Sequence, residues 1–352
     1  MQSAESRPSA RNDLAGFLKR NCFWLLVACY VLAAAVPRPG QQLRAWRWTP
    51  SSLPATEITV PLVLLAVLLF CAAVQTDIAQ IRSLRARPWA LLVGTIAVWI
   101  APALLVVAAA WGLPLVVDAQ PNAELLVGLA LVASMPVANS SVGWTQLVRG
   151  NLALSLALVL VTIFLSPWVT PALLGALRFT LNAADQSNFS VLVDNFSGAF
   201  FIIWVVLPTA AGLACRHSLG SERVAVLRNA LTITSVGSLL VLNYANAALA
   251  FPEVFEQSQF IALAAAVLLA LAVSAVGMVA GHLIARLLRE DPPTRVALEF
   301  GLGMKHTGLA LLLAGAVLSQ QRLAILMIVL ATLAQHLLAG FIEWRSSRAN
   351  EG

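Results

Sequence analysis

The stretch with the clearest capacity for chemistry runs from Glu299 to Gly308 and reads Glu-Phe-Gly-Leu-Gly-Met-Lys-His-Thr-Gly. It places an ammonium group, Lys305, and an imidazole, His306, beside a long apolar run. An ionisable group inside a membrane span costs roughly 2.5–3.5 kcal/mol on insertion scales, so its presence indicates a function. Three glycines in this stretch also disfavour a continuous helix. The sequence therefore predicts a helix that opens around Lys305.

A second polar stretch lies between Pro136 and Thr145, where Asn139, Ser140 and Ser141 follow the proline inside an otherwise apolar run. An interrupted polar span of this kind is typical of a midplane binding site. Taken singly, each hydroxyl has a structural alternative, because hydroxyls in transmembrane helices often bond back to a carbonyl one turn earlier. Their clustering beside a proline favours a role in lining a site.

The composition indicates a membrane protein. Apolar residues make up 60% of the chain, charged residues 11%, and the mean hydropathy is +0.85. A soluble domain would carry about a quarter charged residues. The net charge of +6 does not indicate nucleic-acid binding, because the arginines lie in short loops rather than in one basic patch. The four cysteines form no CxxC pair and are expected to be buried hydrophobic residues.

Apolar runs that are long enough to cross the roughly 30 Å hydrocarbon layer recur along the chain. We expect an all-α integral membrane protein with ten transmembrane helices, near residues 20–37, 59–76, 88–111, 122–147, 151–174, 192–215, 224–250, 259–288, 294–319 and 321–344. No small-residue cleavage motif follows the first run, so a retained span is expected after a cytoplasmic tail at residues 1–19.

The positive charges predict the orientation of these spans. With ten spans both termini share one side, and most loop arginines, together with Lys19, fall on that side. The positive-inside rule therefore predicts cytoplasmic termini. The loop from Arg38 to Arg47 is the exception, and its Trp46 and Trp48 are expected at headgroup level on the opposite side. Short loops and the absence of a transit peptide favour a bacterial inner membrane.

The number of spans also predicts internal symmetry. A division near residue 180 leaves five spans in residues 20–180 and five in residues 181–345, and an odd number reverses the direction of insertion. Two similar halves would then be inverted repeats, with spans 4 and 9 at equivalent positions. Both spans are polar and interrupted, which is typical of a midplane binding site in a secondary transporter. We expect these broken helices to cross there, where unwound backbone supplies partial charges.

The motif from Met135 to Ser155 resembles the bile acid:sodium symporter family. The shared pattern is a proline, a cluster of small polar residues, then Thr, Leu, Arg-Gly-Asn and Ala-Leu-Ser, matched here by Pro136, Ser141, Thr145, Leu147, Arg149, Gly150, Asn151 and Ser155. Residues 303–310 also resemble the family's Gly-Met-Gln-Asn-Ser-Gly-Leu-Ala. The resemblance covers most of the chain, and it implies a panel domain of spans 1, 2, 6 and 7 and a core domain of spans 3–5 and 8–10.

The resemblance also implies two sodium sites beside the crossing of spans 4 and 9, and this sequence departs from the family at both. At the first site Ser141 and Ser155 are retained, but the family's asparagine, threonine and glutamate fall on Val142, Val159 and Gly301. At the second site a family glutamine falls near residues 97–98. At the two sites together, this sequence therefore retains few of the oxygen-bearing side chains that the resemblance implies as sodium ligands.

The family's other glutamine of the second site, in span 9, falls on Lys305. An ammonium a few ångströms from a sodium ion repels it by several kcal/mol. We therefore expect Lys305 to supply the positive field that sodium supplies in relatives, so that an anionic substrate binds nearby without sodium. A desolvated lysine also loses its proton readily, so the same residue could couple transport to protons.

Three more candidates each have an alternative. His306 replaces an asparagine that the resemblance places against substrate, and it is either a proton carrier or a neutral hydrogen-bond donor. His336 in span 10 resembles the histidine of a family His-Asn pair, and its alternative is a structural role. Glu299 either pairs with Lys305 or is a loop residue beside Arg295 near the cytoplasmic end. The expected substrate-binding residues are Lys305, His306, Thr307, Asn139, Ser140 and His336, and the expected ion-binding or coupling residues are Ser141, Thr145, Ser155, Glu299 and Lys305.

The leading interpretation is a secondary transporter of a small organic anion, such as a steroid conjugate or keto acid, that works by alternating access. An enzyme is not expected, because the sequence has no HExxH or GxSxG motif and no paired carboxylates in its spans. The alternatives are a sodium-coupled symporter with residual oxygen ligands and a channel or transport-incompetent sensor. The expected partners are the organic anion and the lipid bilayer. No cofactor is expected, and the proton rather than sodium is the candidate coupling ion.

Overall fold

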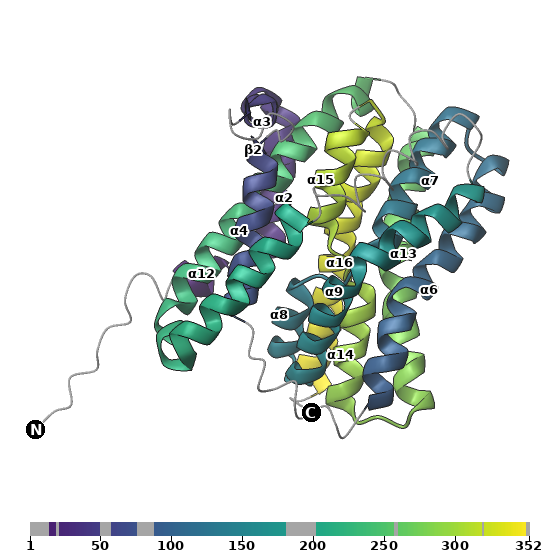
Figure 1. The fold of residues 1–352 in the computed structure, drawn as a ribbon. Helices are drawn as coiled ribbons and strands as arrows, with labels where there is room; N and C mark the ends of the chain where they lie inside the picture. Colours follow the sequence, from purple (N-terminus) through teal and green to yellow (C-terminus); the bar gives the residue numbers. More distant parts are fainter. Residues whose placement is uncertain are drawn as a thin grey trace, which may run out of the picture.

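The computed structural model describes residues 14–18, 21–49, 58–75, 88–180, 202–256, 260–318 and 320–349. This part of the chain is almost entirely helical (Figure 1), as the sequence predicts. Its helices are α2 (Cys22–Ala35), α3 (Pro37–Ala45), α4 (Val60–Val74), α6 (Pro88–Gly112), α7 (Ala119–Ser134), α8 (Ser140–Leu147), α9 (Leu152–Leu177), α12 (Leu207–Glu256), α13 (Phe260–Leu287), α14 (Pro292–Gly303), α15 (Thr307–Val317) and α16 (Arg322–Ala349). Strand β1 (Arg47–Trp48) pairs with β2 (Ile58–Thr59) in antiparallel register.

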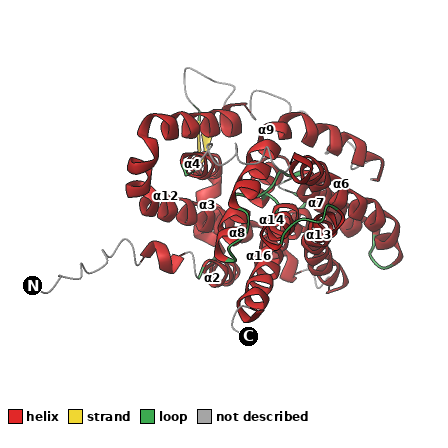
Figure 2. Cartoon of the chain, turned by 90° about the horizontal axis from the view of Figure 1, so that it is seen from below, coloured by secondary structure: helices red, strands yellow, loops and turns green. Residues whose placement is uncertain are grey.

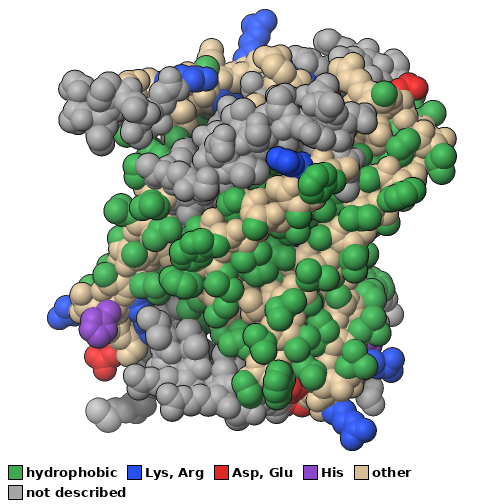
Figure 3. Space-filling view, turned by 45° about the vertical axis from the view of Figure 1, so that its right-hand side comes forward, with side chains coloured by type: hydrophobic (Ala, Val, Ile, Leu, Met, Phe, Trp, Pro, Cys, Tyr) green, Lys and Arg blue, Asp and Glu red, His purple; other side chains and the backbone are tan. Residues whose placement is uncertain are grey.

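Within the described residues, five helical segments are long and apolar enough to cross a membrane: Pro88–Leu115, Leu152–Leu177, Ile202–Ala248, Phe260–Leu287 and Arg322–Glu343. Two shorter apolar helices lie at Trp24–Ala35 and Val60–Cys71. Hydrophobic side chains cover the middle of the face in Figure 3, and Lys and Arg side chains lie toward its two ends. This distribution suits a protein whose middle is in lipid. The predicted tail at residues 1–19 and the start of the span predicted at residues 192–215 fall largely outside the described residues.

The helices pack in two groups that lie side by side. The α12 group consists of α2, α3, α4 and α12, which pack together on the left of Figures 1 and 2. The α13 group contains α6, α7, α8, α9, α13 and α14, on the right. Helices α15 and α16 contact both groups, because α15 packs on α7, α4 and α12 while α16 packs on α13, α2 and α12.

Helix α12 covers parts of two spans that the sequence predicts separately, at residues 192–215 and 224–250. One non-helical residue, Gly220, divides the helix between them. Helical structure continues up to and beyond Gly220, which has φ +71° and ψ 174°. This left-handed conformation is accessible to glycine and strained for residues with a Cβ. Gly220 therefore provides the turn that the sequence predicts between residues 215 and 224.

Gly277 and Gly281 on α13 allow the backbone of α14 to approach closely. A Cβ atom at Gly281 would lie 2.5 Å from the Leu298 carbonyl oxygen and 2.7 Å from the Glu299 nitrogen, and a Cβ atom at Gly277 would meet the Leu302 carbonyl. Small residues spaced four apart are common where membrane helices meet, because they let two backbones come together. Helix α13 thus fixes the position of α14, which leads into the predicted opening.

We predict that Gly281→Ala lowers the free energy of unfolding by about 1–3 kcal/mol, because the added methyl group must displace the α14 backbone. Gly237→Ala in α12 is the matched control, since its Cβ atom would meet nothing within 4 Å. Thermal unfolding of the protein in detergent measures both effects. Equal stability of the two variants would contradict the close approach of α13 and α14.

Candidate functional site

The two polar stretches both interrupt helices, and the interruptions lie against each other. Residues 135–139 separate α7 from α8, and residues 304–306 separate α14 from α15. Val137 and Lys305 form an isolated antiparallel bridge between them. The predicted opening around Lys305 and the predicted break at Pro136 are therefore confirmed.

Backbone hydrogen bonds across the bridge satisfy groups that the broken helices leave without helical partners. The Ala138 N–H donates to the Met304 carbonyl at 2.9 Å, and the His306 N–H donates to the Pro136 carbonyl at 2.9 Å. In a low-dielectric interior an unpaired backbone group is costly, so this mutual pairing stabilises both openings. Each break is therefore held open by the other.

The side chain of Lys305 extends from this bridge into the protein interior, where it is 2% exposed. Its ammonium donates hydrogen bonds to the backbone carbonyls of Val98, Ala133 (3.4 Å) and Met135 (3.2 Å). An ammonium has three N–H groups, so all of its donors have an acceptor. This burial keeps the ammonium in the interior, although long lysine side chains in membrane helices often extend to an interface.

The three carbonyls are available because of features of the local sequence. Pro102 lies within α6 and has no N–H, so the Val98 carbonyl four residues earlier lacks its helical partner. Ala133 and Met135 stand at the end of α7, where the last carbonyls of a helix have no partner in the helix. The negative end of the α7 dipole adds to the attraction. The three carbonyls together form a cation-binding position, and the Lys305 ammonium occupies it.

Neighbouring polar side chains hold the two breaks in position. The Lys305 backbone N–H donates to Gln335 Oε1 at 2.9 Å, and the Val137 N–H donates to Thr162 Oγ1 at 3.1 Å. Sequence reasoning missed both Gln335 and Thr162. It also missed the Val98 carbonyl, although Pro102 inside an apolar run is a signal for a free carbonyl four residues earlier.

His306 caps the second half of the broken helix. Its Nδ1 accepts a hydrogen bond from the Leu309 N–H at 3.3 Å, so Nδ1 carries no proton and the neutral ring carries its hydrogen on Nε2. Nε2 makes no hydrogen bond to any described residue and is not sealed from solvent. His306 therefore acts as a hydrogen-bond acceptor within its own helix, and it does not donate to a neighbouring helix in the described part of the chain. Thr307 follows in α15 and is buried, with its Oγ1 3.5 Å from Gln335 Nε2.

Asn139 and Ser140 lie where α8 begins, directly after the first break. Asn139 precedes the helix, but its side chain makes no capping hydrogen bond. Both side chains are half-buried and make no hydrogen bond within the described part of the chain. Together with His306 Nε2, they are polar groups near the bridge that remain available to a ligand.

The hydroxyls of Ser141, Thr145 and Ser155 gather beside the crossing and are fully buried. Thr145 Oγ1 donates to the Ser141 carbonyl at 2.8 Å and lies 3.2 Å from Ser155 Oγ. Ser141 Oγ has no hydrogen-bond partner among the described residues. At Gly301, where relatives are expected to carry a glutamate, a Cβ atom would lie 2.8 Å from Leu158 Cδ1. Neutral hydroxyls and an apolar side chain therefore occupy this region.

His336 of α16 contacts α8 through Trp144. Its Nδ1 accepts a hydrogen bond from Trp144 Nε1 at 3.1 Å, and the two rings are 6.1 Å apart at their centroids. Trp144 also packs on Phe300, with ring centroids 6.4 Å apart. His336 thus links α16 to α8, which favours the structural alternative for this residue.

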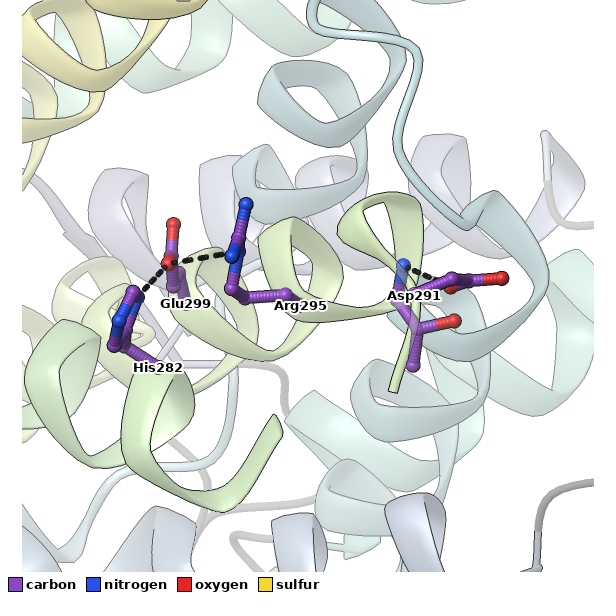
Figure 4. Close-up of polar contacts among 5 residues, drawn as sticks. His282, Asp291, Arg295 and Glu299 are labelled. Atoms are coloured by element: carbon purple, nitrogen blue, oxygen red, sulfur yellow. Dashed lines mark hydrogen bonds and ion pairs between the residues drawn. The ribbon is translucent and has the colours of Figure 1, made fainter. Parts of the chain in front are cut away.

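Glu299 makes its contacts away from Lys305. Its Oε1 lies 2.8 Å from His282 Nδ1 and 4.0 Å from Arg295 Nε, as Figure 4 shows. Asp291, at the start of the same helix, accepts a hydrogen bond from the Thr294 N–H at 3.0 Å. Glu299 lies beside Arg295, as the second alternative expects, but it is within helix α14 and not in a loop. The pairing with Lys305 is not formed, because a regular turn of α14 directs the carboxylate toward α13.

Long apolar helices, together with two interrupted helices that meet in the interior, are typical of secondary transporters. Residues 62–257 match the Sodium Bile acid symporter family, and this match covers more than half of the chain. The chain therefore belongs to that family. Family membership and the apolar helices identify a multi-pass membrane protein and confirm that it is a transporter rather than an enzyme.

Two relatives from Bacillus subtilis (strain 168) are similar to this chain. "Uncharacterized sodium-dependent transporter YocS" is 28% identical over 254 residues, which cover 72% of this chain and 73% of the relative. "Uncharacterized protein YbaS" is 25% identical over 223 residues, which cover 63% of this chain and 69% of the relative.

We predict that Lys305→Met lowers the free energy of unfolding by roughly 3 kcal/mol or more, since it leaves three buried carbonyls without a donor. Lys305→Gln should cost less, because the amide retains two N–H groups for the same carbonyls. Denaturation of both variants in detergent provides the comparison. Wild-type stability in Lys305→Met would contradict the contacts described for the ammonium.

Proposed function

We propose that the protein transports a small organic anion by alternating access, without sodium, and that the Lys305 ammonium replaces a dissolved cation. The observation that carries the proposal is the environment of this ammonium. Three backbone carbonyls surround it, as oxygens would surround a dehydrated alkali ion. The charge is covalently attached to the chain and stays with the protein throughout transport.

The residues at the two expected sodium positions do not fit a sodium ion. At the second, an added ion would lie beside the ammonium and be repelled by several kcal/mol. At the first, Leu158 packs against Gly301, and the remaining side-chain ligands are the neutral hydroxyls of Ser141 and Ser155. A carboxylate would have supplied the negative charge that favours a cation.

The proposed substrate is an anion because of the charge and the donors near the bridge. The N–H groups of Lys305 are all engaged, so the ammonium acts through its field rather than by touching the substrate. His306 Nε2–H, Asn139 and Ser140 are the groups that we propose contact the substrate's anionic end. Thr307 and His336, both buried, would support them. Of the expected substrate-binding residues, three would therefore contact the substrate directly. The other three, Lys305, Thr307 and His336, would act indirectly.

We further propose ten spans arranged as two inverted repeats, with cytoplasmic termini in a bacterial inner membrane. The α12 group would be the panel, and the α13 group with α15 and α16 would be the core. The antiparallel pairing of the two breaks supports this arrangement, because an inverted repeat brings equivalent elements together in opposite directions. The proton is the proposed coupling ion, since Lys305 and His306 are titratable groups at the crossing.

The second candidate function is a sodium-coupled symporter. One observation favours it, because Ser141 Oγ is buried with no hydrogen-bond partner and could act as a ligand. The relative YocS is also named as sodium-dependent. Under this alternative sodium would bind at Ser141, Thr145 and Ser155, and Ser141→Ala would abolish any stimulation by sodium.

We predict that proteoliposomes containing the wild-type protein take up an organic anion equally well in sodium and in potassium buffers. The panel of labelled anions should include a steroid conjugate and a keto acid. Lys305→Gln should slow uptake in potassium on the order of tenfold or more, because the attractive charge is lost. Restoration of uptake in this variant by sodium would show that the two cations are interchangeable.

Several-fold stimulation of wild-type uptake by sodium would contradict the proposal and support the second candidate. Uptake against a concentration gradient, driven by a pH gradient, would exclude a channel. Absence of uptake for every anion, with intact folding, would support the transport-incompetent alternative.

A further inference from the structure

The short helix α3 lies at the upper end of Figure 1, away from α14. It carries Arg44, a second positively charged side chain that is partly buried. Contacts with α12 fix the position of this short helix. Gln41 Nε2 donates to the Ala248 carbonyl at 3.1 Å, and the Tyr244 hydroxyl donates to the Val36 carbonyl at 2.7 Å. A Cβ atom at Gly40 would lie 2.6 Å from Ala248 Cβ, so the two helices are in close contact.

Arg44 extends from this fixed helix into the junction between the two helix groups. Its guanidinium donates to Asn246 Oδ1 on α12. The Asn246 amide is oriented by its own Nδ2, which donates to the Leu242 carbonyl at 2.7 Å. On the other side lies Gly315 of α15, where a Cβ atom would overlap the guanidinium. Glycine is therefore required at this position for Arg44 to occupy the junction.

Arg44 is half-buried, and it has no carboxylate partner in the described part of the chain. Burial, followed by repulsion from Arg322 and Arg47, lowers the pKa of Arg44 to about 10, which still leaves it charged at neutral pH. A partly buried charge without a counter-charge is costly.

The guanidinium has donors to spare. It carries five N–H groups in a planar fork, and its hydrogen bond with Asn246 accounts for one. The other guanidinium nitrogens are not sealed from solvent. The fork geometry matches two oxygens of a carboxylate, sulfonate or phosphate.

We propose that Arg44 is the centre of an oxyanion-binding site at the junction of α3, α12 and α15, separate from the crossing of the broken helices. The ligand is an oxyanion that bridges the fork of Arg44 and supplies its counter-charge. Two sources carry this chemistry, namely the anionic end of a solute and the phosphate of a lipid headgroup. The proposed site does not rest on the proposed transport function, because its test measures the binding of oxyanions and not their transport.

The test uses the purified full-length protein in detergent, with potassium sulfate and potassium phosphate as probes. Potassium chloride at the same ionic strength gives the reference for non-specific effects. We expect both oxyanions to raise the unfolding temperature of the wild type in a saturable manner. Arg44→Gln should increase the half-saturating concentration on the order of tenfold, the value of one charge-assisted hydrogen bond.

Arg38→Gln is the matched control, since it removes one positive charge from an exposed position of the same helix. Arg44→Lys provides a second variant if Arg44→Gln fails to fold, because it keeps the charge and loses the fork. It should bind more weakly than the wild type. Equal losses in the Arg38 and Arg44 variants, or a wild type that responds to oxyanions as it does to chloride, would overturn the proposal.

Nanodiscs identify the source of the oxyanion. In nanodiscs of phosphatidylcholine alone, sulfate should stabilise the wild type but not Arg44→Gln. If a lipid headgroup is the natural ligand, added phosphatidylglycerol stabilises the wild type more than Arg44→Gln and removes the response to sulfate. A response to sulfate that persists with phosphatidylglycerol assigns the site to a soluble anion.

Discussion

The hydrogen bonds from the Lys305 ammonium to three backbone carbonyls are the interaction on which the polar interior depends. They connect α15, through its preceding break, to α6 and to the end of α7. Without a positive charge, these carbonyls would face one another in a dry interior with no donor. The antiparallel bridge at Val137 and Lys305 then holds both helix breaks in one place. Other polar residues near the crossing take their positions from this contact.

A tethered ammonium differs from a dissolved ion in one physical respect. A bound sodium ion can leave into either compartment, so its gradient can do work, whereas a lysine side chain remains with the protein. A carrier with a tethered charge must therefore take its driving force from the substrate gradient or from a proton. Under the proposed replacement of sodium by Lys305, the hydroxyls of Ser141, Thr145 and Ser155 would serve as packing groups.

The sequence predicted the elements of the site better than their contacts. Glycines around Lys305 and the proline at residue 136 predicted the two breaks, because local backbone preference decides where a helix opens. The partners of Lys305 depend on packing between helices distant in sequence, so the Val98 carbonyl and Gln335 were missed. The contact between Glu299 and His282 was missed for the same reason, since it is set by the close approach of α13 and α14. The membership in a transporter family followed from residue types at fixed spacings, and these were visible in the sequence.

The central claim is that the lysine has taken the place of a metal ion. Equilibrium binding of radioactive sodium to the purified protein tests this claim most directly, with Lys305→Gln measured in parallel. Wild-type protein should retain no more sodium than a detergent blank, and Lys305→Gln should bind sodium in a manner that excess unlabelled sodium displaces. Saturable, stoichiometric binding of sodium by the wild type would contradict the account.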